Sequence, residues 1–246
     1  MRDFAITIAG AIGGAALAVA IVFSLSAGGM MPINDRQMQT YMMLHPDLAP
    51  AMMGRAQQLD DLKSQAKQQA GVDRAGKSLF DPKYAFVTGP ANAKKTLVEF
   101  FDYDCPYCRA SLPAIHKYYE AHKADTRFSL IEFPIASLHG PGAVTASLAS
   151  LAARRQPERY MEFHFLLMGE DDSITPEMIF ADATKAGLDI NKLKTDMNDP
   201  AIQKTLDDTL TFAKKIGVNA TPTFVFNGAL HSGAVDDDAL KDALKS

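Results

Sequence analysis

Residues 96–108 read TLVEFFDYDCPYC, and this stretch contains Cys105 and Cys108, the only two cysteines among the 246 residues of the chain. The apolar run at 96–101 predicts a buried strand, and the apolar residues after Cys108 recur at helical spacing. A cysteine at such a strand-to-helix junction lies beside unpaired backbone N–H groups and the positive end of the helix dipole. Both features favour the thiolate, which is the reactive form of the side chain.

The order of the two thiols predicts their roles. Cys105 lies nearer to the N-terminus of the expected helix and is the expected nucleophile, and Cys108 lies one turn further on, where it can resolve a mixed disulfide. Half of a zinc site and an inert structural disulfide are the alternatives. A zinc site normally needs a second pair of Cys or His ligands at metal-ligand spacing, and the sequence has none, so no metal ligand is assigned.

The histidines are scattered along the chain, and each is interpreted as a surface or packing residue. They are His45, His116, His122, His139, His164 and His231.

A second motif lies near the other end of the chain, where residues 217–228 read GVNATPTFVFNG. The segment 224–226 predicts a short strand, and Asn227-Gly228 is typical of a hairpin turn. Pro222 comes just before the strand, where its missing N–H group is tolerated.

Together the two motifs resemble the thioredoxin superfamily, in which this proline follows a cis peptide bond and packs against the CxxC motif. The helical stretch at about 141–214, between the motifs, resembles the insertion of the DsbA-like branch. Its apolar spacing predicts helices at 143–153, 157–167, 175–186 and 200–216. The resemblance covers residues 78–246 and implies an α/β thioredoxin fold with an inserted helical domain.

The resemblance also implies roles for the residues around the cysteines. Thr221 would face the sulfur atoms and tune selectivity, and Pro222 would shape a groove for an unfolded substrate chain. Glu99 matches an acid that helps to move protons in DsbA-like proteins, and buried carboxylates usually have a raised pKa. The alternative for Glu99 is a side chain that points outward at a strand edge. Tyr107 stands where DsbA-like oxidants often carry a histidine, which leaves room for an isomerase.

The first 34 residues are expected to lie outside the globular fold. Residues 4–25 carry no charge and are long enough to span a bilayer, with Arg2 before them. They predict an uncleaved signal anchor or a long signal peptide. In either case the rest of the chain is exported, to the environment in which disulfides persist.

Residues 35–77 predict a helical stalk, with a polar hinge at 72–77 leading into the catalytic domain at 78–246. One helix face carries an apolar stripe at heptad-like spacing. The stripe consists of Leu48, Met52, Leu59, Leu62 and Ala66. It favours a homo-oligomer through residues 35–75, with packing on the catalytic domain as the alternative. This segment resembles the N-terminal region of ScsC-like proteins, DsbA relatives tied to copper tolerance, in which it is implied to mediate oligomerisation.

The sequence therefore predicts an exported protein thiol-disulfide oxidoreductase or isomerase, with the Cys105–Cys108 pair as its redox group and no other cofactor. The expected partners are unfolded or misoxidised exported proteins and a membrane redox partner, either DsbB-like or DsbD/ScsB-like. The expected location is the periplasm, at the inner membrane through residues 4–25 or soluble after signal cleavage. A net charge of −4 gives no reason to expect nucleic-acid binding.

A copper-binding or copper-delivery protein is the alternative from another class. Seven of the twelve methionines lie between Met30 and Met53, and thioethers can bind Cu(I) together with the two thiols. Methionines are also flexible apolar packing residues, which is the more ordinary interpretation.

Overall fold

The computed structural model describes residues 40–245, apart from Met42 and Asp47. The signal sequence or anchor expected within residues 1–34, and the start of the stalk, lie outside the described residues. Within the described part, no helix is both long and apolar enough to cross a bilayer. The chain divides into two units between Leu62 and Lys63.

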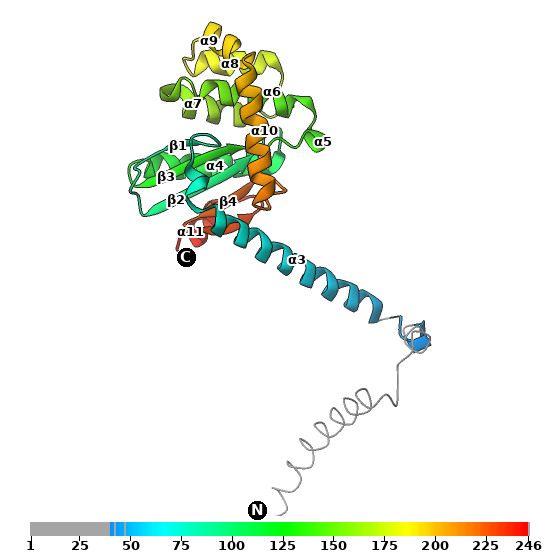
Figure 1. The fold of residues 1–246 in the computed structure, drawn as a ribbon. Helices are drawn as coiled ribbons and strands as arrows, with labels where there is room; N and C mark the ends of the chain where they lie inside the picture. Colours follow the sequence, from blue (N-terminus) through cyan, green and yellow to red (C-terminus); the bar gives the residue numbers. More distant parts are fainter. Residues whose placement is uncertain (1–39, 42, 47, 246) are drawn as a thin grey trace, which may run out of the picture. The chain divides into compact units, whose positions relative to one another are not determined.

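The elements in chain order are shown in Figure 1. They are α3 (Leu48–Ala75), a 3₁₀ turn η1 (Gly76–Phe80), β1 (Phe86–Thr88), β2 (Lys95–Phe101), α4 (Pro106–His122), β3 (Thr126–Glu132), α5 (Ala136–His139), α6 (Pro141–Ala153), α7 (Pro157–Met168), α8 (Pro176–Lys185), α9 (Ile190–Met197), α10 (Pro200–Lys215), β4 (Thr223–Phe226), β5 (Ala229–Ser232) and α11 (Asp237–Lys245).

The sheet has five strands in the order β1-β3-β2-β4-β5. Strands β2 and β3 are parallel, and the other neighbouring pairs are antiparallel. The carboxyl ends of β2 and β3 therefore meet at one edge of the sheet, where Phe101 pairs with Glu132. The loop that carries the cysteines leaves the sheet at this edge.

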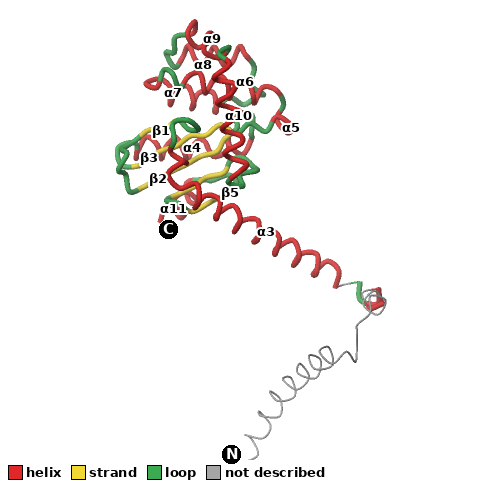
Figure 2. The backbone as a smooth tube through the Cα atoms, in the orientation of Figure 1, coloured by secondary structure: helices red, strands yellow, loops and turns green. Residues whose placement is uncertain are grey.

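The two faces of the sheet bury different clusters, because successive side chains of a strand point to opposite faces. On one face Val98, Phe100 and Ile131 pack with Ala213 of α10 and with Val72 near the end of α3. Figure 2 shows the strands, in yellow, with helices on both sides of the sheet.

On the other face Leu97, Phe128 and Phe226 pack against Ile115 of α4 and Leu240 of α11. Both faces are thus covered, and β2 in the middle of the sheet is buried on both sides. The thioredoxin fold expected from the sequence is confirmed.

Helices α6 to α10 form the block that separates β3 from β4 in the chain. Helix α6 contacts α7, α8, α9 and α10. Close approach on several sides is possible because the buried positions of α6, apart from Leu151, are alanines and serines, such as Ala146, Ala149 and Ala153. The structure adds α9 to the four helices expected here, and the side chain of Asp189 caps its first turn by accepting a hydrogen bond from the Lys192 N–H group.

The polar hinge expected at 72–77 is wrong. Helix α3 continues to Ala75, and Val72 is 2% exposed. Upstream of it, the side chain of Gln69 donates to the carbonyl oxygen of Gly228 and accepts from the N–H group of Leu230. The last turns of α3 therefore belong to the core of the second unit. The helix extends this far because one of its faces, around Val72, finds an apolar surface to cover.

Candidate active site

The cysteines lie where β2 passes into α4. After Phe101 a short loop leads to Cys105, which occupies the N-cap position of α4, and Pro106 begins the helix. The N–H group of Cys105 donates to the carbonyl oxygen of Asp102 at 3.1 Å. Both cysteines are free thiols and both are buried.

The environment makes the Cys105 thiol unusually acidic. A hydrogen bond from the Cys108 side chain is the main cause that lowers the pKa of Cys105 to about 5, with smaller contributions from Thr221 and from the backbone N–H groups at the start of α4. Burial opposes this shift but does not cancel it. Cys105 is therefore a thiolate at neutral pH, which suits a nucleophile.

The environment has the opposite effect on Cys108. Burial is the main cause that raises the pKa of the Cys108 thiol, and the hydrogen bond shared with Cys105 and the nearby charge of Glu99 act in the same direction. One thiol of the pair is thus held ionised while the other is held protonated. This is the order that the sequence predicts.

The second motif lies beside the first, although 116 residues separate Cys105 from Thr221. The Sγ atom of Cys105 lies 3.3 Å from the carbonyl oxygen of Thr221. The Thr221–Pro222 peptide bond is cis, as expected, and β4 begins directly after it. The Thr221 side chain also acts on this sulfur, since it is one of the groups that lower the pKa of Cys105.

Glu99 lies on β2, between Leu130 of β3 and Phe224 of β4 in the register of the sheet. Its side chain is 3% exposed, so the alternative of an outward-facing residue at a strand edge is wrong. Burial raises the pKa of Glu99 to about 8. The carboxyl group is therefore mostly protonated at neutral pH, and only its ionised form raises the pKa of Cys108.

Asp102 and His139 form a contact that the sequence analysis missed. The Asp102 side chain is fully buried, and its Oδ2 atom accepts hydrogen bonds from the His139 ring at 2.6 Å and the Ile135 N–H group at 2.8 Å. Its Oδ1 atom accepts from the Asp104 N–H group at 3.0 Å. His139 was interpreted as a surface or packing residue; the acidic residues just before Cys105 were the available signal for this cluster.

Arg109, on the first turns of α4, makes a second set of contacts around the cysteine loop. It donates to the carbonyl oxygen of Tyr103, to Oδ1 of Asp104 and to the carbonyl oxygens of residues 171 and 172. The segment that precedes α8 is thereby joined to the start of α4. Gly142 fits here because a Cβ atom would lie 2.8 Å from Oδ2 of Asp104.

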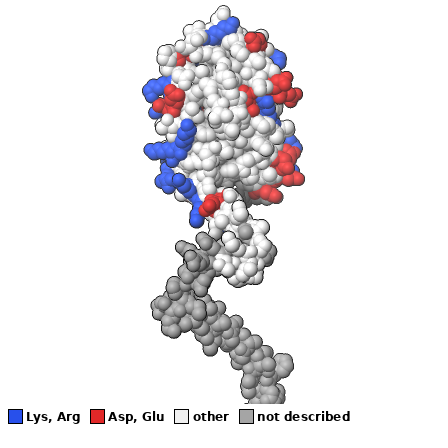
Figure 3. All heavy atoms as spheres, turned by 90° about the vertical axis from the view of Figure 1, so that its right-hand side faces the viewer, with Lys and Arg blue, Asp and Glu red and all other residues white. Residues whose placement is uncertain are grey.

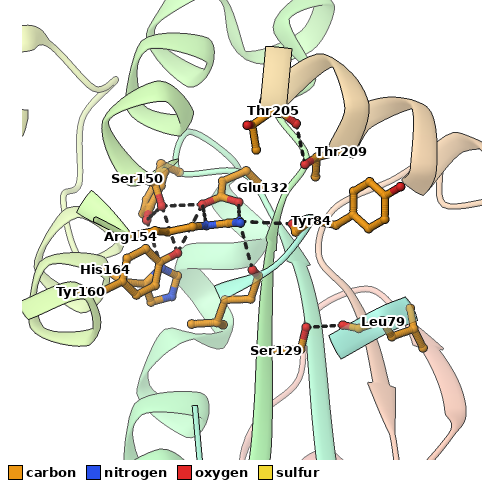
Figure 4. Close-up of polar contacts among 12 residues, drawn as sticks. Leu79, Tyr84, Ser129, Glu132, Ser150, Arg154, Tyr160, His164, Thr205 and Thr209 are labelled. Carbon is orange, nitrogen blue, oxygen red and sulfur yellow. Dashed lines mark hydrogen bonds and ion pairs between the residues drawn. The ribbon is translucent and has the colours of Figure 1, made fainter. Parts of the chain in front are cut away.

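A buried polar network extends from this loop, through Tyr103, into the helical block. Figure 4 shows its part around Glu132, Ser150, Arg154 and His164. The Tyr103 hydroxyl donates to Oγ of Ser150 at 3.0 Å, and Ser150 donates to Oε1 of Glu132 at 2.7 Å. Glu132 forms an ion pair with Arg154. His164 also belongs to the network, because its ring contacts the Tyr103 hydroxyl at 3.1 Å. Burial lowers the pKa of His164 to about 3, so the ring is neutral.

A thioredoxin family model matches residues 82–246. The chain belongs to the thioredoxin family. The resemblance to ScsC-like proteins of the DsbA-like branch is also confirmed.

Two solved structures show the extent of the similarity. A thioredoxin-like oxidoreductase from Silicibacter pomeroyi is 37% identical, with a TM-score of 0.60, over 69% of this chain and 95% of that one. The catalytic domain of ScsC from Proteus mirabilis is 26% identical, with a TM-score of 0.62, over 72% of this chain and 96% of that one.

Curated relatives include a Na(+)/H(+) antiporter NhaA from Salinispora tropica, which is 30% identical over 166 residues. The match spans 68% of this chain but only 25% of the antiporter. The chain thus corresponds to about a quarter of the length of the curated relatives it matches.

The first prediction concerns the origin of the acidity of Cys105. Cys108→Ala removes the hydrogen-bond donor and should raise the pKa of Cys105, whereas Cys108→Ser keeps a donor and should raise it less. The rate of Cys105 alkylation as a function of pH measures both values. Equal pKa values in the two variants would show that the Cys108 side chain is not the main cause.

The second prediction concerns the pH dependence of folding in the reduced protein. In the unfolded chain Glu99 ionises near its ordinary pKa of 4.5, but in the folded protein it keeps its proton up to about pH 8. The folded state therefore binds the additional proton in this window, and its stability falls as the pH rises from about 4.5 to 8.

Glu99→Gln removes this titration. The free energy of unfolding of the variant, relative to the wild type, should increase by about 1.4 kcal/mol per pH unit across the window. Urea unfolding at a series of pH values measures the difference. Parallel curves for the two proteins would mean that Glu99 titrates normally in the fold.

Proposed function

We propose that the chain is an exported thiol-disulfide oxidoreductase that exchanges disulfides with substrate proteins through Cys105 and Cys108. The observation that carries this proposal is the opposite shift of the two thiol pKa values within one buried pair. A thiolate that is stable at neutral pH is both a nucleophile and a good leaving group. Metal sites do not need this asymmetry, since they bind each cysteine as a thiolate.

In the oxidising direction, a substrate thiolate attacks Sγ of Cys105 in the Cys105–Cys108 disulfide. The S–S bond breaks, and its electron pair leaves on Cys108, which takes up a proton. A second substrate thiolate attacks the substrate sulfur of the mixed disulfide, forms the substrate disulfide and releases Cys105 as a thiolate. Two electrons have then passed to the protein, which ends with two free cysteines.

Glu99 is suited to supply the proton that Cys108 takes up. Its carboxyl group is protonated at neutral pH and is buried beside the same sulfur. A proton donor whose pKa is close to the operating pH can both give and regain its proton. Thr221 also lies against Cys105, with its carbonyl oxygen 3.3 Å from Sγ, and we expect a bound substrate chain to pass beside this residue and Pro222.

The compartment, partners and cofactor follow from this chemistry. Export through residues 4–25 would place the cysteines in the periplasm, where a disulfide persists. Substrates are unfolded or misoxidised exported proteins, and a membrane redox partner, DsbB-like or DsbD/ScsB-like, would restore the working redox state. The cysteine pair itself is the redox group, so the reaction needs no organic cofactor.

The third prediction tests the reaction directly, with the full-length oxidised protein and a reduced two-cysteine peptide. The wild type should convert the peptide to its disulfide. Cys105→Ser should be inactive, because it lacks the sulfur that is attacked. Cys108→Ser keeps the Cys105 thiolate but cannot resolve the product, so it should accumulate a mixed disulfide when it is mixed with the disulfide form of the peptide. Mass spectrometry after acid quenching identifies the species. Turnover by Cys105→Ser would refute the proposed roles.

Assembly through α3 would favour isomerisation, because several active sites would then face a shared substrate. In the unit that ends at Leu62, the side chains of Met52, Leu59 and Leu62 are exposed by 53%, 43% and 54%. Exposed apolar residues at heptad-like spacing are typical of a helix that pairs with another helix.

The fourth prediction tests this assembly with Leu59→Lys/Leu62→Lys. The double variant should lose the oligomer and the repair of a scrambled disulfide substrate, but it should still oxidise a dithiol peptide. Gln57→Lys/Gln58→Lys, which adds the same charge to exposed polar positions of the helix, is the control. Light scattering of the full-length proteins measures the masses. A wild-type monomer at tens of micromolar would end the proposal of assembly.

Copper binding is a second candidate, supported by the exposure of three methionines of the same unit. Met43, Met52 and Met53 are exposed by 82%, 53% and 73%, which leaves their thioether groups accessible to Cu(I). A Cu(I) titration of Cys105→Ser/Cys108→Ser separates binding by methionines from binding by the thiol pair.

A further inference from the structure

Helix α5 is held at the edge of the sheet where the cysteines lie. Its preceding residue, Ile135, and its last residue, His139, both donate to Oδ2 of Asp102. The carbonyl oxygen of Asp102 accepts the N–H group of Cys105. One residue thus connects α5 to the nucleophile, and α5 is placed beside the active site rather than elsewhere on the surface.

This helix presents an unusually exposed leucine. From Lys63 to the end of the described chain, only two large hydrophobic side chains count as exposed: Tyr107, by 64%, and Leu138, by 73%. Tyr107 lies between the two cysteines, and Leu138 lies on α5. A single exposed leucine is ordinary, but Leu138 is the chain neighbour of His139, whose ring contacts Asp102, three residues before Cys105.

The distribution of charged residues around α5 indicates which kind of substrate segment could bind there. The side of the second unit that carries α5 in Figure 1 faces the viewer in Figure 3. The middle of that face is largely free of Lys, Arg, Asp and Glu, which gather towards its flanks (Figure 3). A substrate segment lying across the middle of this face would meet largely uncharged surface.

We propose that Leu138 is a specificity-determining residue, which contacts an apolar side chain next to the reacting cysteine of an unfolded substrate polypeptide. The proposal rests on the proposed function, since it needs the substrate sulfur to be positioned at Cys105. An unfolded chain exposes apolar side chains that a folded protein buries, and covering one of them together with Leu138 removes apolar surface from water. The side chain of Leu138 has no titratable proton and no hydrogen-bonding group. It therefore affects the recognition of the substrate and not the thiol chemistry.

The test uses the full-length oxidised protein and two reduced peptides with the same cysteine spacing, one with leucines and one with serines beside the cysteines. The wild type should favour the leucine peptide. Leu138→Ser should reduce the second-order rate constant for single-turnover oxidation of the leucine peptide by roughly five- to tenfold, and should leave the serine peptide nearly unchanged. Leu138→Met, which keeps the apolar surface, should restore the preference.

Two controls separate recognition from chemistry and folding. Ser137→Ala changes the exposed neighbour of Leu138 on α5 and should leave both peptides unaffected. Oxidation of dithiothreitol, which has no flanking side chain, should be the same in all of these variants. The pH profile of Cys105 alkylation should also be unchanged by Leu138→Ser.

The outcomes distinguish this inference from the proposed function. If the wild type oxidises dithiothreitol but Leu138→Ser keeps the full preference for the leucine peptide, the inference is overturned and the proposed function stands. An equal loss on both peptides would also overturn it, since the role of Leu138 would then be structural. If the wild type oxidises neither dithiothreitol nor the peptides, the proposed function fails, and the inference fails with it.

Discussion

The buried carboxylate of Asp102 holds the active-site loop in place. The loop between β2 and α4 has no partner strand, so its polar groups need other bonds when they are buried. Asp102 supplies them by accepting from Asp104, Ile135 and His139, while its own carbonyl oxygen accepts from Cys105. These bonds keep Cys105 at the N-cap of α4, where the helix favours its thiolate. The position of α5, and hence of Leu138, depends on the same residue.

Two buried carboxyl groups three residues apart show how local hydrogen bonding decides their use. Both oxygens of Asp102 receive donors, which suits a structural role. Oε2 of Glu99 has no partner among the described residues, and burial raises the pKa of this group to about 8. The two carboxyl groups thus differ in what surrounds their oxygens, and the one whose Oε2 has no partner is the one whose charge affects Cys108.

The features that follow from local sequence were predictable, and the contacts between distant segments were not. The cysteine pair after an apolar run predicted where β2 passes into α4, and the Thr221–Pro222 segment predicted where β4 begins. Burial of Glu99 depended on whether β2 lies inside the sheet, which the apolar run suggested but did not decide. The contact between Asp102 and His139 joins residues 37 positions apart, and no periodic pattern relates them. The hinge expected at 72–77 was wrong because most residues near Val72 are polar, and the sequence there does not show that one narrow apolar face of α3 is buried.

The helical block also contributes to the support of the active site. Tyr103, two residues before Cys105, is bonded through its hydroxyl to Ser150 of α6, and Ser150 is bonded to Glu132 at the end of β3. Glu132 and Arg154 are a buried ion pair, and removing one partner of such a pair typically costs about 3–5 kcal/mol because the other charge is left uncompensated. The sheet and α6 are therefore constrained to a single arrangement, and the loop of Tyr103 is supported from both. The inserted helical block is therefore joined, through Ser150, both to the loop that carries Cys105 and to the end of β3.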